Sequence, residues 1–143
     1  MKEHIETIPV NEAFGSGDEC PFCWLEREIE QKAIRYCVGH SASYMEPDVR
    51  GVTDVKGFCT HHAKKIYDYG NVLGCALILQ THYAHLLKKF QAEHEELEMP
   101  AKKGLFSKKK QPDGKTAYWQ ELQQQAESCF VCDKISYNMA RYY

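Results

Sequence analysis

The sequence lacks most of the features that assign a protein to a class at once. No apolar run approaches the roughly 20 residues that a membrane span requires, and the polar start Met1–His4 is followed by no apolar stretch, so we expect neither a membrane span nor a secretory signal. The charge has no dominant sign, because 18 Lys and Arg face 20 Asp and Glu, which excludes a uniformly basic nucleic-acid binder. A Gly-rich phosphate loop, a GxSxG motif and a Ser-His-Asp grouping are also missing. We therefore predict a cytoplasmic protein and assign no catalytic residue.

Cysteine, in contrast, is abundant, with seven residues among 143. Seven is an odd number and the cytosol is reducing, so a disulfide framework is not expected. Cys20 and Cys23 form a C-x-x-C pair, and Cys59 and His62 form a C-x-x-H pair. Structural zinc takes four Cys or His ligands, and a two-residue gap lets both side chains of a pair turn onto one ion. The sequence therefore predicts a zinc site made of Cys20, Cys23, Cys59 and His62.

A second C-x-x-C pair, Cys129 and Cys132, has no further C-x-x-H pair after it before Tyr143. Like the first pair, it is followed by a helical pattern. We therefore hypothesise an internal repeat of which the second copy is incomplete in this chain. The late pair would then be free, disulfide-bonded, recruited to the first site, or shared across a dimer, and it is a candidate second metal or redox pair.

The first pair also has a redox interpretation. Over four residues, Cys20–Cys23 resembles the active-site motif of glutaredoxins. A thioredoxin-like site requires an apolar strand directly before the motif, whereas residues 13–19 indicate a loop. A thiol redox or metal-responsive protein that uses its C-x-x-C pairs remains the alternative to the zinc interpretation.

The apolar spacing predicts a mainly α-helical domain with a small zinc-knuckle or treble-clef-like core and at most a short β-hairpin. The hairpin is expected at Val49–Val52 and Val55–Phe58, and residues 1–19 are expected to be extended and then loop-like. Gly39 and Gly70 are expected to end helices, and Asn71 to cap the next one. The predicted helices cover residues 24–36, about 59 to 69, 72 to about 97, 117–126 and about 133 to the end.

The predicted organisation has three parts: a first repeat with the long helix (1–98), a Lys-rich linker (99–116) and the start of an incomplete second repeat (117–143). Lys108, Lys109 and Lys110 of the linker are the candidates for a contact with nucleic acid or an anionic membrane surface. We favour a solvated loop for this segment and expect no nucleic-acid partner.

Other chemistry-bearing residues have simpler interpretations. His82 and His85 lie three apart on the long helix and, with His61, could share a second metal, but exposed or core histidines explain the pattern better. Cys37 and Cys75 lie among apolar residues and are expected to be small buried hydrophobes.

In combination, the motifs resemble those of a bacterial family of unknown function, found mostly in anaerobic Gram-positive bacteria. The resemblance covers most of the chain except the linker. It is carried by residues 7–14, 20–23, 45–50, 57–62, 70–77 and 129–132. Members of that family look longer than this chain, with a second C-x-x-C and a later Phe-Cys-x-x-His. The resemblance identifies Cys20, Cys23, Cys59 and His62 as motif residues and implies no established activity.

The function that the sequence favours is a non-enzymatic, zinc-stabilised interaction module. Four protein ligands leave no open metal position, which is typical of a structural ion. Its partner would be another protein or a second copy of the chain.

Overall fold

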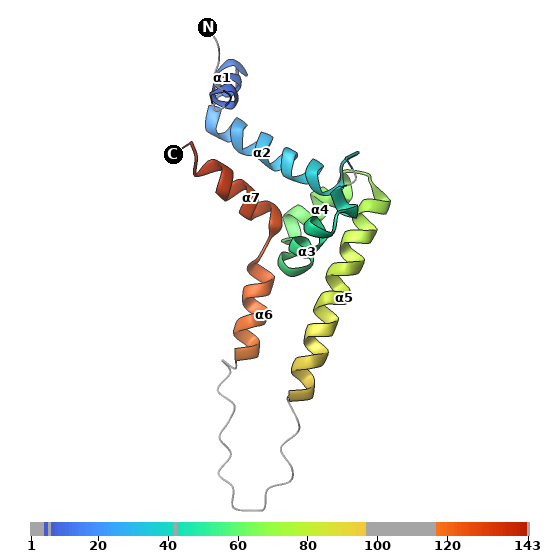
Figure 1. Ribbon diagram of the computed structural model, residues 1–143. Coiled ribbons are helices and arrows are strands. Elements are labelled where there is room, and N and C mark those ends of the chain that lie inside the picture. Colours follow the sequence, from blue (N-terminus) through green and yellow to red (C-terminus); the bar gives the residue numbers. More distant parts are fainter. Residues whose placement is uncertain (1–4, 6, 42, 97–116, 143) are drawn as a thin grey trace, which may run out of the picture.

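A computed structural model of the protein describes residues 5, 7–41, 43–96 and 117–142 (Figure 1). These residues form seven α-helices and one short 3-10 helix, with no strand among them. The elements are α1 (Ile8–Gly15), α2 (Pro21–Val38), η1 (Ser43–Met45), α3 (Pro47–Lys56), α4 (Thr60–Asp68), α5 (Val72–Glu96), α6 (Ala117–Glu127) and α7 (Phe130–Met139). The predicted mainly α-helical fold is confirmed. The predicted linker, with the candidate contact residues Lys108, Lys109 and Lys110, lies outside the described residues.

Local signals account for several helix ends. Gly39 follows the last residue of α2, and its N–H donates to the carbonyl of Arg35 over 2.8 Å. Gly70 has a φ of +88°, a left-handed conformation in which a side chain would be strained. Asn71 caps α5, because its Oδ1 accepts the N–H of Gly74 over 3.0 Å. The predicted stops at both glycines and the predicted cap at Asn71 are confirmed.

Two segments expected to be non-helical are helices. The predicted hairpin is wrong, because Pro47–Lys56 forms α3 with Pro47 in its first turn. Val49 and Thr53, four residues apart, are the buried side chains of that helix, so the β-branched residues follow a helical period and not the two-residue period of a strand. The N-terminal segment expected to be loop-like contains α1, in which Ala13 is buried.

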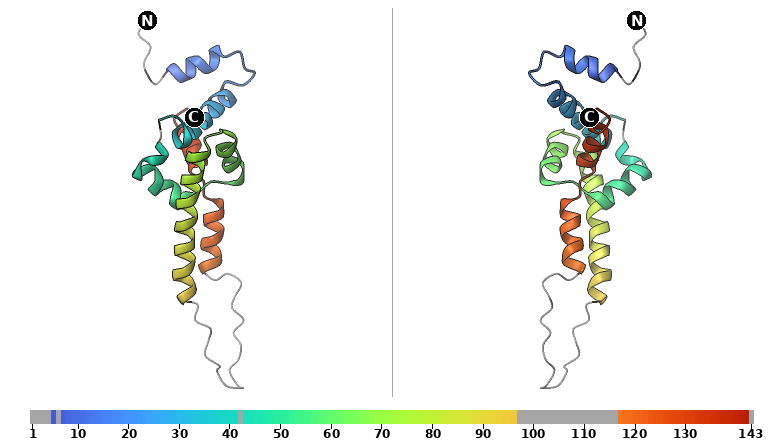
Figure 2. Two further views of the ribbon diagram at one scale, coloured as in Figure 1. Left: turned by 90° about the vertical axis from the view of Figure 1, so that its right-hand side faces the viewer. Right: turned by 90° about the vertical axis from the view of Figure 1, so that its left-hand side faces the viewer.

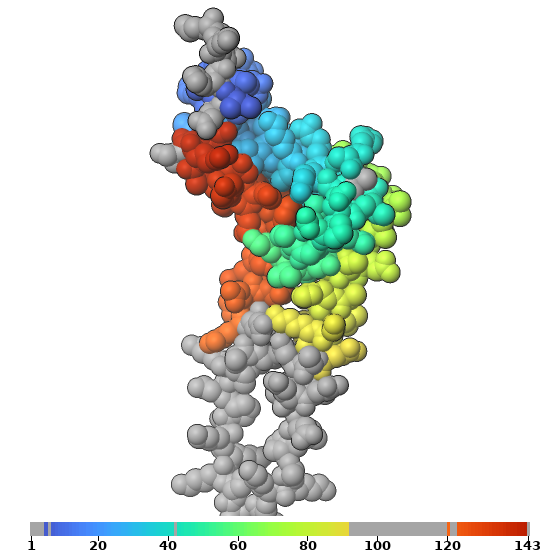
Figure 3. Space-filling model, viewed as in Figure 1, coloured from blue at the N-terminus to red at the C-terminus, as the bar shows by residue number. Residues whose placement is uncertain are grey.

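The main hydrophobic core lies where α2, α4, α5 and α7 meet. Val38, Ile66, Ile78 and Val131 are the largest apolar side chains that are fully buried there. The space-filling view shows α7 (red) lying against α1 and α2 (blue) as one continuous body (Figure 3). Helix α7 and its N-cap residue therefore contribute to the same core as the N-terminal helices.

A smaller cluster joins the beginning of α2 to the end of α7. Leu25 of α2 packs with Met139 of α7 and with Ala13 of α1. At the other end of the pair, Cys37 lies near Cys129. The two helices are therefore antiparallel. The first turn of α2 lies at one end of the pair and the first turn of α7 lies at the other end.

The long helix α5 projects from this body on the same side as α6, and the chain runs in opposite directions in the two helices (Figures 1 and 2). Of its described side chains, Cys75 and Ile78 are buried, whereas Leu73, Tyr83 and Leu87 are more than half exposed. The expectation that Cys37 and Cys75 are buried is confirmed. None of the helices in the described parts of the chain combines the length and apolar composition that crossing a membrane would require.

Candidate metal centre

Two short motifs place their ligands at the first turn of a helix. Cys59 is the N-cap of α4 and Cys129 is the N-cap of α7, and both have an extended backbone. The residue three positions later, His62 or Cys132, lies in the first turn that follows. Because residues three apart share a face of a helix, each motif turns two side chains towards one point.

Backbone and side-chain bonds hold the two motifs together. The N–H of Phe130 donates to the carbonyl of Gly57 over 3.0 Å. The hydroxyl of Ser128 donates to the carbonyl of Lys56, and the Lys56 ammonium pairs with Asp133. These contacts join the segment before α4 directly to the segment that begins α7.

Gly57 is required at this junction. Its φ is +63°, and a Cβ atom there would lie 2.6 Å from the ring of His82. That ring is fixed in place, because its Nδ1 lies 2.8 Å from the carbonyl oxygen of Asp54. His82 therefore packs and bonds as a structural side chain.

The four ligand atoms form one compact cluster. The Nδ1 atom of His62 lies 3.2 Å from the sulfur of Cys59, 3.3 Å from that of Cys132 and 3.4 Å from that of Cys129. The sulfurs of Cys59 and Cys132 are 3.9 Å apart. All four cysteine and histidine atoms lie within 4.8 Å of one another, so the cluster could hold a metal ion.

Glu30 of α2 orients the imidazole of His62. The Nε2 atom of His62 lies 3.0 Å from a carboxylate oxygen of Glu30, and the Lys65 ammonium donates to the other oxygen over 2.5 Å. A carboxylate can only accept, so it places the ring proton on Nε2 and leaves the Nδ1 lone pair facing the three thiols. A carboxylate behind a ligating histidine is the usual outer partner at metal sites.

The pKa values of Cys59 and Cys132 are shifted in opposite directions. Burial disfavours the Cys59 thiolate, but hydrogen bonds from the backbone N–H of His62 and from the neighbouring thiols outweigh it, so the pKa of Cys59 is lowered. Burial and the two neighbouring cysteines raise the pKa of Cys132 to about 12. Three crowded sulfurs thus cannot all ionise alone, whereas a bound cation would let them do so.

The pKa values of His62 and of the Glu30 carboxyl are both lowered. Burial lowers the pKa of His62, although Glu30 opposes the shift. Burial raises the pKa of the Glu30 carboxyl, but Lys65 and His62 outweigh this effect and the net pKa is lowered. A neutral imidazole beside an ionised carboxylate is the state that metal coordination requires.

The structure changes the grouping of the predicted ligands. It brings Cys59 and His62 together, as the sequence predicts, and joins them to Cys129 and Cys132. It does not bring Cys20 and Cys23 to this cluster. The late pair thus lies beside Cys59 and His62, in the place predicted for Cys20 and Cys23.

Cys20 and Cys23 lie at the beginning of α2, where the N–H of Cys23 donates to the sulfur of Cys20 over 3.3 Å. Cys23 borders an open cavity of about 470 Å³ that also touches His62 and Cys132. His61 is largely exposed and lies 3.3 Å from Glu30. The described residues contain no metal group that joins His61 to His82 or His85.

Sequence reasoning did not identify Glu30 and Lys65 as parts of the site. Glu30 is one of many acidic residues on an amphipathic helix, and no sequence signal marks it. The late pair did carry a signal, since a C-x-x-C before a helix matches the form of the first pair.

The fold and the cluster together define a small helical protein with a Cys3His cluster that could hold a metal ion. Over residues 1–143 the chain matches a family of unknown function, DUF6062, and it belongs to that family. No curated protein and no solved structure matches the chain.

Proposed function

We propose that the protein is a non-enzymatic interaction module stabilised by zinc at Cys59, His62, Cys129 and Cys132. The observation that carries this proposal is the geometry of the cluster. With Zn–S near 2.3 Å and Zn–N near 2.0 Å, a regular tetrahedron has N···S edges of about 3.5 Å and S···S edges of about 3.8 Å. The 3.2–3.4 Å and 3.9 Å separations in the cluster are close to these edges.

A structural role for the ion follows from the number of ligands. Three sulfurs and one nitrogen take all four positions of the tetrahedron, so no position remains for water or a substrate. The ligands come from two helices that are distant in the sequence, and the ion would lock α4 to α7. This supports a role in shaping the protein surface rather than in catalysis.

The surface beside the centre supports a protein partner. A cavity of about 590 Å³ lies between α2, α3 and α7, with apolar walls from Val49, Val52 and Phe130. Phe130 directly follows a ligand, so the ion would hold one wall of this cavity in place. Lys56 and Asp133 stand at the same cavity, and this mix of apolar and charged groups suits a polypeptide segment with apolar side chains.

Zinc content measured on ligand variants tests the proposal. In the Cys20→Ser/Cys23→Ser chain, purified under reducing conditions, we expect about one zinc per chain by mass spectrometry of the metal. Adding Cys129→Ser to that chain should abolish stoichiometric binding, and Cys59→Ser should do the same. Cys75→Ala, which removes a buried thiol outside the cluster, is the matched control and should retain the ion.

The same variants separate the two possible ligand sets. If the site consisted of Cys20, Cys23, Cys59 and His62, the Cys20→Ser/Cys23→Ser chain would contain no zinc and Cys129→Ser alone would retain it. That result would refute the centre proposed here.

A further inference from the structure

The beginning of α2 has the same local form as the metal-binding turn of α7. Cys20 is an N-cap residue in an extended conformation (φ −129°, ψ 106°), as is Cys129 (φ −156°, ψ 122°). In both segments the helix starts at the next residue, and the second cysteine lies in its first turn. A segment that is built to present two sulfurs to an ion at α7 is therefore repeated at α2.

The α2 pair is incomplete as a metal site within the described chain. Both thiols are free, Cys20 is half-buried and Cys23 is exposed. No third cysteine, histidine or carboxylate of the described residues lies close enough to form a metal group with them. The pair thus offers two of the four ligands that a tetrahedral ion needs.

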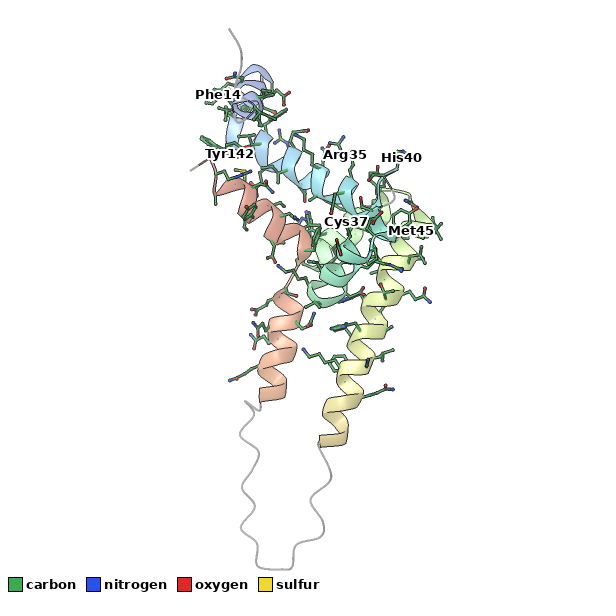
Figure 4. All side chains as sticks on the ribbon, in the orientation of Figure 1. Phe14, Arg35, Cys37, His40, Met45 and Tyr142 are labelled. Carbon is green, nitrogen blue, oxygen red and sulfur yellow. The ribbon has the colours of Figure 1, made fainter. Side chains whose placement is uncertain are left out.

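The surface around this pair is apolar and open. A groove of about 770 Å³ is lined by Pro21 and Phe22, which lie between the two cysteines, and by Phe14 and Tyr142. Figure 4 shows Phe14 and Tyr142 at this end of the α2–α7 pair, remote from Cys37 at the other end. The side chain of Phe14 is 68% exposed and that of Phe22 is 41% exposed. Exposed apolar side chains that lie next to the pair in this way are typical of a contact surface.

We propose that Cys20 and Cys23 form half of a second zinc site, which the same pair of a second copy of the chain completes. Two identical pairs supply four thiolates, which is a full ligand set for structural zinc. A two-fold axis through the ion would bring the apolar groove of each copy against its partner. Arg141 at the groove supplies positive charge beside the doubly negative zinc–tetrathiolate cluster, and Arg27, one helical turn after Cys23, adds a guanidinium that is paired with Asp18.

The inference goes beyond the proposed function, and the two can fail separately. The centre made of Cys59, His62, Cys129 and Cys132 (the Cys59 centre) accounts for one ion per chain. The site shared by two copies adds one ion per two chains. The full chain loaded with Zn²⁺ under reducing conditions should therefore contain about 1.5 zinc ions per chain. Its mass by light scattering should be twice the 16.5 kDa of one chain.

Variants of the pair give the decisive comparison. Cys20→Ser/Cys23→Ser should lower the content to about one zinc per chain and yield a monomer, whereas the Cys75→Ala control should remain dimeric with three ions. Loading with Co²⁺ gives a second readout, because a tetrathiolate site absorbs differently from the Cys3His centre and its spectrum should vanish only in the pair variant.

Three results would overturn the inference. The first is a wild-type monomer with one zinc per chain in which both thiols react freely with an alkylating reagent. The second is a dimer that persists in Cys20→Ser/Cys23→Ser. The third is a Cys20–Cys23 disulfide under the same reducing conditions, which would favour thiol redox chemistry at this pair.

Discussion

The two ends of the α2–α7 pair carry the same cysteine motif in different surroundings. Where α7 begins, Cys129 and Cys132 meet Cys59 and His62; His62 and Cys129 are buried, and Glu30 contacts His62. Where α2 begins, Cys23 is exposed and Cys20 is half-buried, and a groove with apolar side chains lies next to them. The comparison teaches that a C-x-x-C spacing specifies a turn able to present two sulfurs, whereas the packing of a second turn against it decides whether a complete centre forms.

Disrupting the metal ligands at the beginning of α7 should reduce the stability of the fold far more than the same change at the beginning of α2. Structural zinc contributes roughly 10–16 kcal/mol of apparent binding free energy, which is comparable with the whole stability of a domain, about 5–15 kcal/mol. We expect Cys129→Ser, or a strong chelator, to abolish the cooperative thermal unfolding transition followed by far-ultraviolet circular dichroism.

The matched change at the other end is Cys20→Ser. Serine is a good N-cap residue, so at low protein concentration the free energy of unfolding should change by less than about 1 kcal/mol. Equal losses of stability in Cys129→Ser and Cys20→Ser would contradict the view that only the pair at the beginning of α7 belongs to a complete metal centre within one chain.

Glu30 provides a smaller, more local test, because it supports only the Cys59 centre. Loss of a carboxylate behind a ligating histidine typically lowers metal affinity about 10–100-fold. We expect that loss for Glu30→Gln in competition with a chromophoric chelator. Glu26→Gln, an exposed change one turn earlier on α2, should leave the affinity unchanged, and an equal effect of both changes would remove the role assigned to Glu30.

The smallest expected effect is a difference in reactivity within the exposed pair. Hydrogen bonds from the side chain and the N–H of Cys23 lower the pKa of Cys20, whereas the neighbouring Cys20 raises the pKa of Cys23. Below both pKa values, Cys20 has the larger thiolate fraction and should react several-fold faster with iodoacetamide.

Peptide mass spectrometry after brief alkylation, with exchangeable metal removed by a mild chelator, measures this ratio. The preference should shrink as the pH rises through both pKa values, because both thiols are then ionised. A preference for Cys23 at neutral pH would contradict the assigned hydrogen bonds.

Signals that act over a few residues were readable from the sequence. Gly39 and Asn71 marked helix boundaries because a stop or a cap depends on local hydrogen bonds. The segment Val49–Phe58 was misread because its β-branched residues suit strands, whereas tertiary packing selects a helix that buries Val49 and Thr53.

In the candidate site, too, the local spacing was predictable and the long-range packing was not. The spacing identified Cys59 and His62 as half of a centre, and a C-x-x-C pair as the other half. It favoured Cys20 and Cys23 over Cys129 and Cys132, whereas the structure places the late pair beside Cys59 and His62. The choice depends on whether α2 or α7 presents its first turn to α4. The hydrogen bond that the N–H of Phe130 donates to the carbonyl of Gly57, which no local pattern encodes, favours α7.

The centre is also a cross-link between distant parts of the chain, since His62 and Cys132 are separated by 70 positions. Because the four ligands meet only in the folded state, closing a loop of that size is an entropic cost of folding, roughly 4 kcal/mol by the chain-entropy account used for disulfides. This cost depends only logarithmically on loop length. Adding or deleting about ten residues between the two motifs would change it by roughly 0.1 kcal/mol, so the stability of the fold should be nearly indifferent to the length of the segment that the cluster encloses.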